Sequence, residues 1–248
     1  MIQDLHAHTY YSFCGNDSPE QLIETAIKGG IEVLGICDHN YGVANERIDT
    51  VCQRKDKRIK DYQRSFIRYF DHMRLVAKQY AGQIKIWNGI ELSTLKTNPH
   101  WPLPDEIDAS IFDYCLIESV DSNDTVATDM FAYAKRCNCK NVGIAHTNLP
   151  AFIESTGQDM LSFFSRMAAE NIFWEINVNY DSIHNYREHA YVQRVFQDEN
   201  LQQILRDSNV KLSVGFDSHK AVEYAADRIK DACNRLTELH LPLVEFDL

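Results

Sequence analysis

The segment Val33–His39, with the sequence VLGICDH, joins a short apolar run to two polar residues. A run that is apolar along its whole length is typical of a strand covered on both faces, as in a parallel sheet. Asp38 and His39 then fall where that strand ends. In barrels of alternating strands and helices, functional residues lie at the carboxyl ends of the strands. This segment therefore predicts both a buried parallel strand and a functional position.

Six more segments of strand character occur along the chain, and helical patterns separate them. The predicted strands are Ile2–His6, Val33–Cys37, Ile84–Glu91, Tyr114–Glu118, Asn141–Ala145, Phe173–Val178 and Lys211–Phe216. The predicted helices are Leu22–Lys28, Asp56–Ala81, Thr125–Cys137, Gln158–Glu170, Tyr186–Asp207 and Ala221–Leu239. Because strands and helices alternate and no linker divides the chain, we expect one domain over residues 1–248. The expected fold is α/β, a barrel of parallel strands.

Composition excludes several classes of protein. With 248 residues, 44% of them hydrophobic, the chain can bury a full core and is not a disordered protein. Its net charge of −11 argues against general nucleic-acid binding. No apolar run reaches the roughly 20 residues that span a bilayer, and the first residues lack a signal-peptide pattern. Seven cysteines at irregular spacings indicate reduced thiols, so we expect a cytoplasmic protein.

Potential metal ligands follow most of the predicted strands. They are His6 and His8, His39, Glu91, His146, and Asp217 with His219. In the pairs His6/His8 and Asp217/His219, side chains two residues apart on an extended chain point the same way and can hold one ion. Imidazole and carboxylate are ligands that Zn²⁺, Mn²⁺ and Fe²⁺ share. A purely structural role would require many buried polar groups, each needing a partner. The pattern therefore predicts a metal centre.

The same motifs, in this order, resemble the PHP (polymerase and histidinol phosphatase) family. They are Asp4-x-His6-x-His8-Thr9, Asp38-His39, Gly89-Ile90-Glu91, Ala145-His146-Thr147 and Gly215-Phe216-Asp217-Ser218-His219. The resemblance implies a distorted (β/α)7 TIM-like barrel with two to three divalent ions, Zn, Mn or Fe. By analogy, one ion is held by His6, His8, Glu91 and Asp217. A second ion shares Glu91 and takes His146, and a third takes His39 and His219.

Two positions depart from the richest family pattern. Cys14 stands where the third ion often has a histidine, and its thiolate would favour Zn²⁺ or Fe²⁺ over Mg²⁺. Near the end of the fourth strand, Asp121 or Glu118 stands in for a histidine of the second ion. Asp38 adjoins a proposed ligand, and Asp4 precedes His6 by two residues. We expect these two carboxylates to support metal-binding imidazoles.

The cluster implies hydrolysis of a phosphate ester. Divalent ions orient a phosphate and lower the pKa of bound water, so a metal-bound hydroxide would attack phosphorus without a separate side-chain nucleophile. Arg187, on the loop after the sixth predicted strand, is the candidate phosphate ligand, and His184 on the same loop is a candidate substrate contact. Arg47 and Lys220 are the alternatives to Arg187. The segment Glu175-x-Asn177 resembles a pocket-lining segment of histidinol-phosphatase-like proteins.

The sequence thus predicts a small-molecule phosphomonoesterase of histidinol-phosphatase type, whose partner is a small phosphorylated substrate. Two alternatives remain. One is a phosphodiesterase or nuclease acting on nucleotides or short oligonucleotides, and the other is a non-catalytic metal-binding module. Metal analysis, together with hydrolysis of an aryl phosphate and its bis-aryl diester, would discriminate among the three.

Overall fold

The structure, a computed structural model, describes residues 1–44, 55–97 and 101–246. Within these ranges, seven strands form one sheet in which each strand pairs in parallel with the next along the chain. They are β1 (Gln3–Asp4), β2 (Val33–Ile36), β3 (Lys85–Leu92), β4 (Tyr114–Ile117), β5 (Val142–Ile144), β6 (Ile172–Asn177) and β7 (Leu212–Gly215). Each lies within one of the predicted segments or overlaps it.

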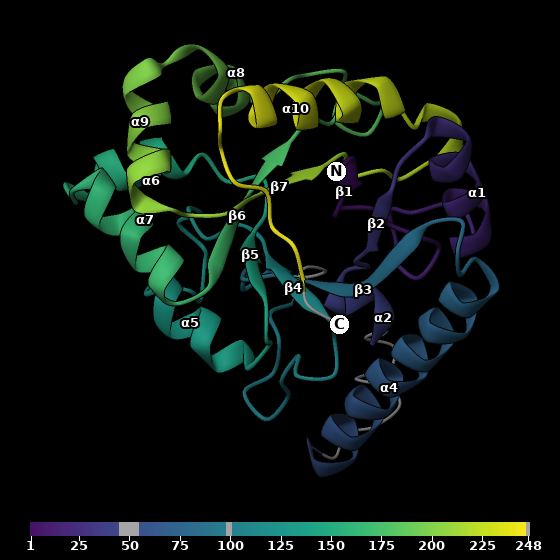
Figure 1. Ribbon diagram of the computed structural model, residues 1–248. Helices are drawn as coiled ribbons and strands as arrows, with labels where there is room; N and C mark the ends of the chain where they lie inside the picture. Colours follow the sequence, from purple (N-terminus) through teal and green to yellow (C-terminus); the bar gives the residue numbers. More distant parts are fainter. Residues whose placement is uncertain (45–54, 98–100, 247–248) are drawn as a thin grey trace.

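Hydrogen bonds between the first and last strands nearly close the sheet. The Leu5 amide donates to the Val214 carbonyl at 2.8 Å, and the Asp217 amide donates to the His6 carbonyl at 2.7 Å. Helices surround the strands (Figure 1). The architecture is therefore a (β/α)7 TIM-like barrel, which confirms the predicted fold class.

The helices lie between successive strands, except the last, which follows β7, and most begin at a capping side chain. They are α1 (Pro19–Gly29), α2 (Asn40–Val43), α4 (Lys55–Gln79), α5 (Met130–Cys137), α6 (Leu149–Thr156), α7 (Met160–Ala169), α8 (Ala190–Gln197), α9 (Glu199–Ser208) and α10 (Ala226–Glu238). At α1, the Ser18 hydroxyl accepts from the Gln21 amide while the Gln21 side chain accepts from the Ser18 amide. This capping box begins the helix where Ser18 and Pro19 predict it.

Three predicted helices are corrected, and two of the described helices were not predicted. The expected single helix Tyr186–Asp207 is two helices, because the Asp198 carboxylate accepts from the amides of Asn200 and Leu201 and starts α9. The expected helix Thr125–Cys137 begins only at Met130, where the Asp129 side chain caps it. The expected helix Ala221–Leu239 is a short 3-10 helix at Ala221–Glu223 followed by α10, and helices α2 and α6 were not predicted.

The interior of the barrel at the amino-terminal ends of its strands is apolar. Trp87, Tyr114, Phe173 and Phe246 pack together there, with Phe246 5.2 Å from Trp87 and 5.4 Å from Tyr114 between ring centroids. The Tyr114 hydroxyl donates to the Leu5 carbonyl at 2.7 Å, across the barrel. Any side chain at Gly35 or Gly89 would collide with the Tyr114 ring, so these strands need glycine there.

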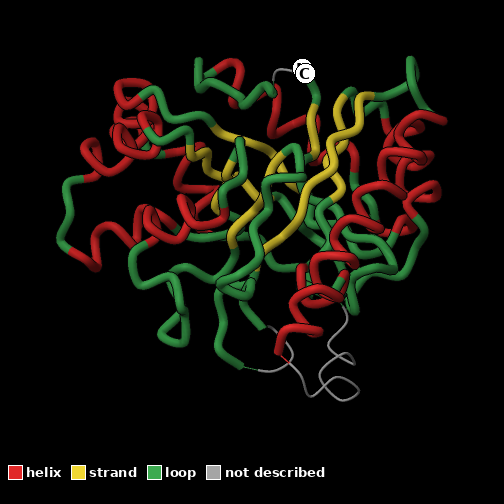
Figure 2. Tube along the Cα trace, turned by 90° about the horizontal axis from the view of Figure 1, so that it is seen from below, coloured by secondary structure: helices red, strands yellow, loops and turns green. Residues whose placement is uncertain are grey.

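The segment that carries Phe246 covers this end of the barrel. Its Val244 amide donates to the Leu212 carbonyl at 2.8 Å, and its Val244 carbonyl accepts from the Gln3 side chain at 3.1 Å. In Figure 2 the carboxyl terminus lies at one end of the strands, opposite the loops that leave their carboxyl ends. The barrel therefore has a closed apolar end and an open end.

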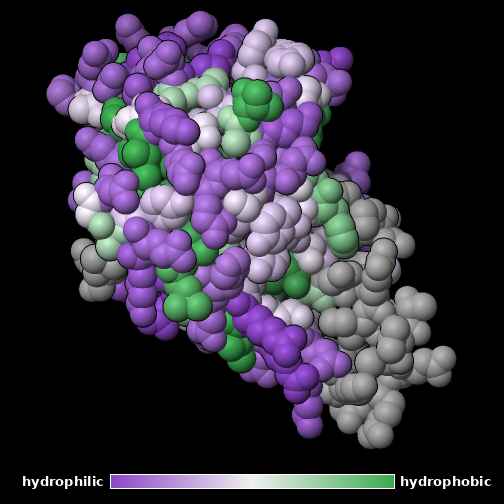
Figure 3. Space-filling view, turned by 90° about the vertical axis from the view of Figure 1, so that its right-hand side faces the viewer, coloured by the Kyte–Doolittle hydropathy of each residue, from purple (hydrophilic) through white to green (hydrophobic). Residues whose placement is uncertain are grey.

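The outer face over α1 and α4 is mainly hydrophilic, with scattered apolar side chains (Figure 3). Ile67 and Leu75 of α4 are among the exposed apolar residues. Within the described residues, no helix combines the length and the apolar character that a membrane span needs.

Candidate metal centre

The open end of the barrel brings together side chains from all seven strand ends. His6 and His8 follow β1, His39 follows β2, Glu91 lies in β3, Glu118 follows β4, His146 follows β5, Glu175 lies in β6, and Asp217 and His219 follow β7. All of them are buried except His146, whose side chain is 24% exposed. The structure thus gathers His6, His8, His39, Glu91, His146, Asp217 and His219 at one site.

Glu91 lies at the middle of this site, and four imidazoles surround its carboxylate. Its Oε1 atom is 3.1 Å from His146 Nε2 and 3.4 Å from His6 Nε2. Its Oε2 atom is 2.9 Å from His39 Nδ1 and 3.4 Å from His8 Nε2. Burial favours the neutral acid, but the charges of His39 and His6 outweigh it and hold the Glu91 pKa well below its usual value. Glu91 is therefore an anion that can be shared between two ions.

Asp217 approaches the same imidazoles from the opposite side. Its Oδ1 atom lies 3.0 Å from His8 Nε2 and 3.4 Å from His6 Nε2. Its backbone has a φ of 56°, and that of His146 has a φ of 24°, both in the left-handed region that non-glycine residues rarely adopt. Strained residues of this kind persist where the surroundings hold them, and they cluster at functional sites.

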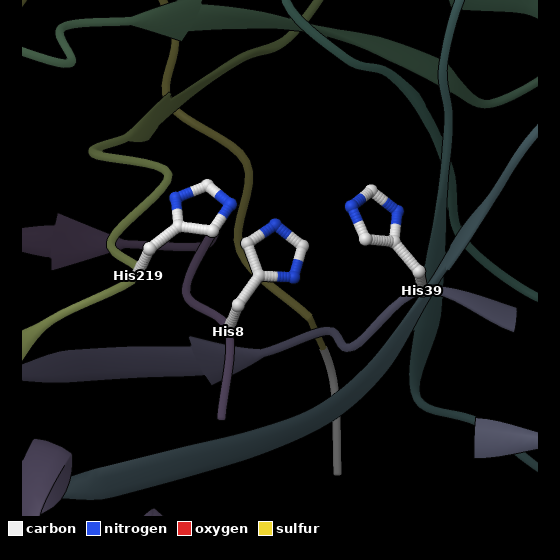
Figure 4. A group of neighbouring side chains, drawn as sticks. All are labelled: His8, His39 and His219. Carbon is white, nitrogen blue, oxygen red and sulfur yellow. The ribbon is translucent and has the colours of Figure 1, made fainter. Parts of the chain in front are cut away.

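Three histidine rings project side by side from the ends of β7, β1 and β2 (Figure 4). The His8 ring lies 4.6 Å from both the His39 ring and the His219 ring, centroid to centroid. Burial, reinforced by the positive charge of His39, lowers the His8 pKa to about 3. His8 is therefore a neutral imidazole, the form that binds metal ions.

The donor atoms of this site fit divalent ions. Several triplets, among them His6/Glu91/His146 and His39/Glu91/Glu118, place one ligand atom per residue within 4.8 Å of the others. Buried atoms of this site that have no hydrogen-bond partner among the described residues include Glu118 Oε1, Asp181 Oδ2 and His219 Nδ1. Such atoms cost free energy unless another group satisfies them. Ions bound by imidazole and carboxylate would satisfy them together.

Glu175 supports two of the candidate ligands. Its Oε1 atom is 2.7 Å from His6 Nδ1, and its Oε2 atom accepts from the His146 amide at 2.7 Å. The Asn177 side-chain Nδ2 atom donates to the same Oε2 atom at 3.3 Å. Because the Nδ1 atom of His6 is held in this way, its Nε2 atom faces Glu91 and Asp217. The sequence singled out Glu175 as a pocket residue without predicting this contact.

Asp4 and Asp38 differ from expectation, because they accept hydrogen bonds from backbone amides and hydroxyl groups and not from imidazoles. Asp38 accepts from the amide and hydroxyl of Thr9, both at 2.7 Å, and from the Ser12 hydroxyl at 2.7 Å. Asp4 accepts from the amides of His6 and Phe216 and from the Tyr224 hydroxyl. These carboxylates therefore fix the backbone that carries the ligands. Ser12 provides an indirect link, since its hydroxyl is 3.2 Å from His8 Nδ1.

Of the two carboxylates offered near β4, the structure places Glu118 in the site and Asp121 outside it. Glu118 Oε1 is 3.6 Å from His39 Nδ1. Asp121 is exposed, because the chain turns away after Ser119, whose φ is 61°. Asp121 belongs to none of the ligand triplets found among the described residues, which argues against the prediction that it is a metal ligand. Burial disfavours the Glu118 anion and, with the neighbouring charge of Glu91, raises the Glu118 pKa.

Cys14 lies against His219 and His39, where the sequence placed it. Burial opposes ionisation of its thiol, but hydrogen bonds with His219 and His39 outweigh burial and lower the Cys14 pKa. A thiol with a lowered pKa next to two imidazoles is a possible third ligand for the ion assigned to them.

The residues that we expected to contact the substrate differ in whether they are free to do so. Arg187 is exposed on the loop after β6 and forms no ion pair with any described residue. His184 is occupied instead, with Nδ1 2.7 Å from Asp181 Oδ1 and Nε2 3.1 Å from Asp217 Oδ2, so neither nitrogen is free for a substrate. Lys220 donates to the Ser182 hydroxyl at 2.8 Å. Arg47 lies outside the described residues.

The sequence analysis did not find Asp181, which is 1% exposed and belongs to a ligand triplet with His184 and His219. The spacing Asp181-x-x-His184 on a loop after a strand was the available signal. It is a weak one, because such a spacing is common in loops.

Comparisons with known proteins show the family and the fold of this chain. Residues 4–240 match the family model described as the PHP domain. The chain is similar in fold to the histidinol phosphate phosphatase of Lactococcus lactis subsp. lactis Il1403, a structure complexed with zinc, L-histidinol and phosphate. The two share 14% identity over 99% of this chain and 97% of that one, with a TM-score of 0.58.

Two further solved structures are more distant. The putative histidinol phosphatase of Listeria monocytogenes is 15% identical over 90% of this chain and 97% of that one, with a TM-score of 0.45. A chain of archaeal ribonuclease P, solved with mature tRNA, is 10% identical over 98% and 96%, with a TM-score of 0.46. A search of curated protein sequences gave no match.

Proposed function

The chain belongs to the PHP domain family, and we propose that it is a metal-dependent phosphoesterase that hydrolyses a small phosphomonoester. The observation that carries this proposal is the ring of imidazoles around the buried Glu91 carboxylate. A buried carboxylate surrounded by four imidazoles at 2.9–3.4 Å is costly as a structural feature and suited to ions held in common.

In this proposal each residue of the centre has a defined task. Glu91 provides one oxygen atom to the His6/His146 side and the other to the His39/His8 side. Glu175 holds His6 and the backbone of His146 in place. Bound divalent ions would supply charge stabilisation and an activated water molecule. The Ser12 hydroxyl, which lies 3.2 Å from His8 Nδ1, donates its proton to the Asp38 carboxylate at 2.7 Å and is not available as a nucleophile, so hydrolysis would rest on the ions.

Arg187 is the proposed phosphate contact outside the ions. Its guanidinium is exposed and forms no ion pair with a described residue, so it is free to donate two parallel hydrogen bonds to phosphate oxygens. It lies three residues after His184, which contacts Asp217 of the centre. A phosphate at the centre would therefore lie near the loop that carries Arg187.

We further propose that the substrate resembles histidinol phosphate in size and class. The Lactococcus enzyme of similar fold was solved with L-histidinol and phosphate. At 14% identity this likeness concerns the fold, so the substrate is the part of the proposal that most needs a direct test.

The test is hydrolysis by purified protein that has been stripped of metal and reloaded with Zn²⁺, Mn²⁺ or Fe²⁺ in turn. We expect an aryl phosphate to be cleaved faster than its bis-aryl diester, and a panel of phosphorylated metabolites then identifies the substrate. Preference for the diester would favour the nucleotide-directed phosphodiesterase. Metal binding without hydrolysis of either ester would favour a non-catalytic module. Asp121→Asn is a suitable control, because this exposed carboxylate lies outside the centre.

A further inference from the structure

Asp181, on the loop after β6, has one satisfied carboxylate oxygen and one unsatisfied one. Its Oδ1 atom accepts from the His184 amide at 2.9 Å and lies 2.7 Å from His184 Nδ1. Its Oδ2 atom is buried and has no hydrogen-bond partner among the described residues. The nearest imidazole nitrogen in an ion pair with Oδ2 is His219 Nδ1 at 4.0 Å, and this nitrogen is also buried and without a hydrogen-bond partner.

We propose that Asp181 is a metal ligand that shares an ion with His219, and that His184 is the positioning residue that holds the Asp181 carboxylate. This inference rests on the proposed metal-dependent function. It adds a ligand from β6 that neither the sequence motifs nor the family resemblance supplied.

The distance between the two unsatisfied atoms supports an ion between them. At 4.0 Å, Asp181 Oδ2 and His219 Nδ1 are too far apart for a hydrogen bond. They are close enough to bind one ion, because metal–nitrogen and metal–oxygen bonds of about 2.0–2.2 Å span such a gap. A single ion would therefore satisfy both buried atoms.

His184 joins this position to the rest of the centre. Its Nδ1 atom contacts Asp181, and its Nε2 atom is 3.1 Å from Asp217 Oδ2. Asp217 Oδ1 in turn is 3.8 Å from His219 Nδ1. One imidazole thus orients two carboxylates toward the same histidine, as supporting groups commonly do at metal sites.

A purely structural Asp181–His184 pair is the competing interpretation. It accounts for Oδ1 and for the conformation of the loop. It leaves Oδ2 buried without a hydrogen-bond partner among the described residues, which costs free energy because the oxygen loses its hydration. The metal interpretation accounts for both oxygens.

The first experiment measures ion binding, not activity. Equilibrium dialysis against Mn²⁺ or Zn²⁺ compares wild type with Asp181→Asn and with the matched control Asp121→Asn. We expect Asp181→Asn to lose one ion per chain or to bind it at least about tenfold more weakly, while Asp121→Asn matches wild type. Unchanged stoichiometry and affinity in Asp181→Asn overturn the inference. Wild-type protein that binds no ion would instead contradict the proposed function.

A second experiment asks whether Asp181 touches the ion. In a Cys14→Ser background, Asp181→Cys places a thiolate at the proposed ligand position, and Co²⁺ is the probe. Direct ligation predicts a new near-ultraviolet sulfur-to-cobalt charge-transfer band that the Cys14→Ser parent and an Asp121→Cys control lack. A folded, cobalt-binding Asp181→Cys protein without that band overturns direct ligation.

The role of His184 is tested by rescue. His184→Ala removes the imidazole that contacts Asp181 and leaves only the backbone amide of residue 184 as a donor, and we expect about 10–100-fold weaker binding of the same ion. His184→Asn restores an N–H donor near the Nδ1 position and should recover part of the affinity. Wild-type affinity in His184→Ala would overturn the positioning role.

Discussion

The two ends of the barrel are made of the same seven strands but are lined by opposite kinds of side chain. At the closed end, inward-facing residues such as Trp87, Tyr114 and Phe173 are apolar and pack against Phe246. At the open end, inward-facing residues such as Glu91 and Glu175 carry carboxyl groups whose partners are histidines. Substitutions at the closed end should therefore change stability, whereas those at the open end should change chemistry.

The largest expected effect is at the centre of the open end. Glu91→Gln keeps the size of the side chain but removes the charge that four imidazoles surround. We expect loss of metal and a fall in kcat of at least about a hundredfold. Metal analysis and phosphatase kinetics measure both. A variant with wild-type metal content and kcat would mean that Glu91 is structural.

At the closed end, Phe173→Ala should lower stability and leave metal binding unchanged. Phe173 is 2% exposed and packs against Phe246, so its removal leaves a cavity. We expect the free energy of unfolding to fall by about 3–5 kcal/mol, while metal content per folded chain stays at the wild-type value. Denaturant titration measures the change in stability, and metal analysis measures the metal content. Metal loss in folded Phe173→Ala protein would show that the two ends are coupled.

The stability of the metal-free protein should depend on pH because of the buried histidines at the open end. Burial lowers the His146 pKa, but the Glu91 carboxylate outweighs it and raises that pKa to about 9. The His146 pKa is thus higher in the folded protein than in the unfolded chain. Protonated His146 therefore stabilises the folded protein fully below about pH 6.5, and this stabilisation is lost as pH rises toward 9. His6 and His39 shift in the same direction. We expect the free energy of unfolding to fall by at least about 2 kcal/mol between pH 6.5 and 9.5.

Denaturant titrations of metal-free protein across that range provide the measurement, and protein saturated with metal is the control. Metal-bound imidazoles are already deprotonated, so the metal-loaded protein should show a smaller slope. Equal slopes with and without metal would show that these histidines do not bind the ion.

The smallest expected effect is at the rim of the open end. Arg187→Ala removes an exposed guanidinium that touches no ligand, so metal content and stability should not change. We expect kcat/KM for a phosphomonoester to fall about tenfold, the lower end for a lost charge-assisted hydrogen bond. Wild-type kinetics would exclude the loop after β6 as the phosphate contact and leave Arg47 and Lys220 to test.

Most of the fold could be predicted because its signals are local. The seven apolar runs mark the strands, and the residues after them mark the site. Helix α6 carried its own signals, Asn148 as cap, Pro150 in the first turn and Gly157 in a left-handed conformation at its end, but it is only one residue longer than two turns. The break at Asp198 was hidden because α8 and α9 together read as one amphipathic helix.

The site residues that directly follow strands could be predicted from the sequence. Contacts that depend on how distant segments pack against one another could not. Glu118 and Asp121 are equally plausible in sequence, and only the left-handed turn at Ser119 separates them. The roles of Asp4, Asp38 and Glu175 depend on which strand lies opposite each carboxylate. Asp181 and His219 are far apart in the chain, so no spacing pattern could have paired them.

The contact between β1 and β7 has a consequence for how the protein acquires its ions during folding. Leu5 pairs with Val214 and His6 with Asp217, so His6 and His8 meet Asp217 through contacts between residues more than two hundred positions apart. Such contacts form late, because closing a long loop costs entropy before any contact compensates for it. A nascent or partly refolded chain would present His6 and His8 without Asp217 and His219. Ion capture should therefore follow barrel closure, and added metal should slow unfolding far more than it speeds refolding.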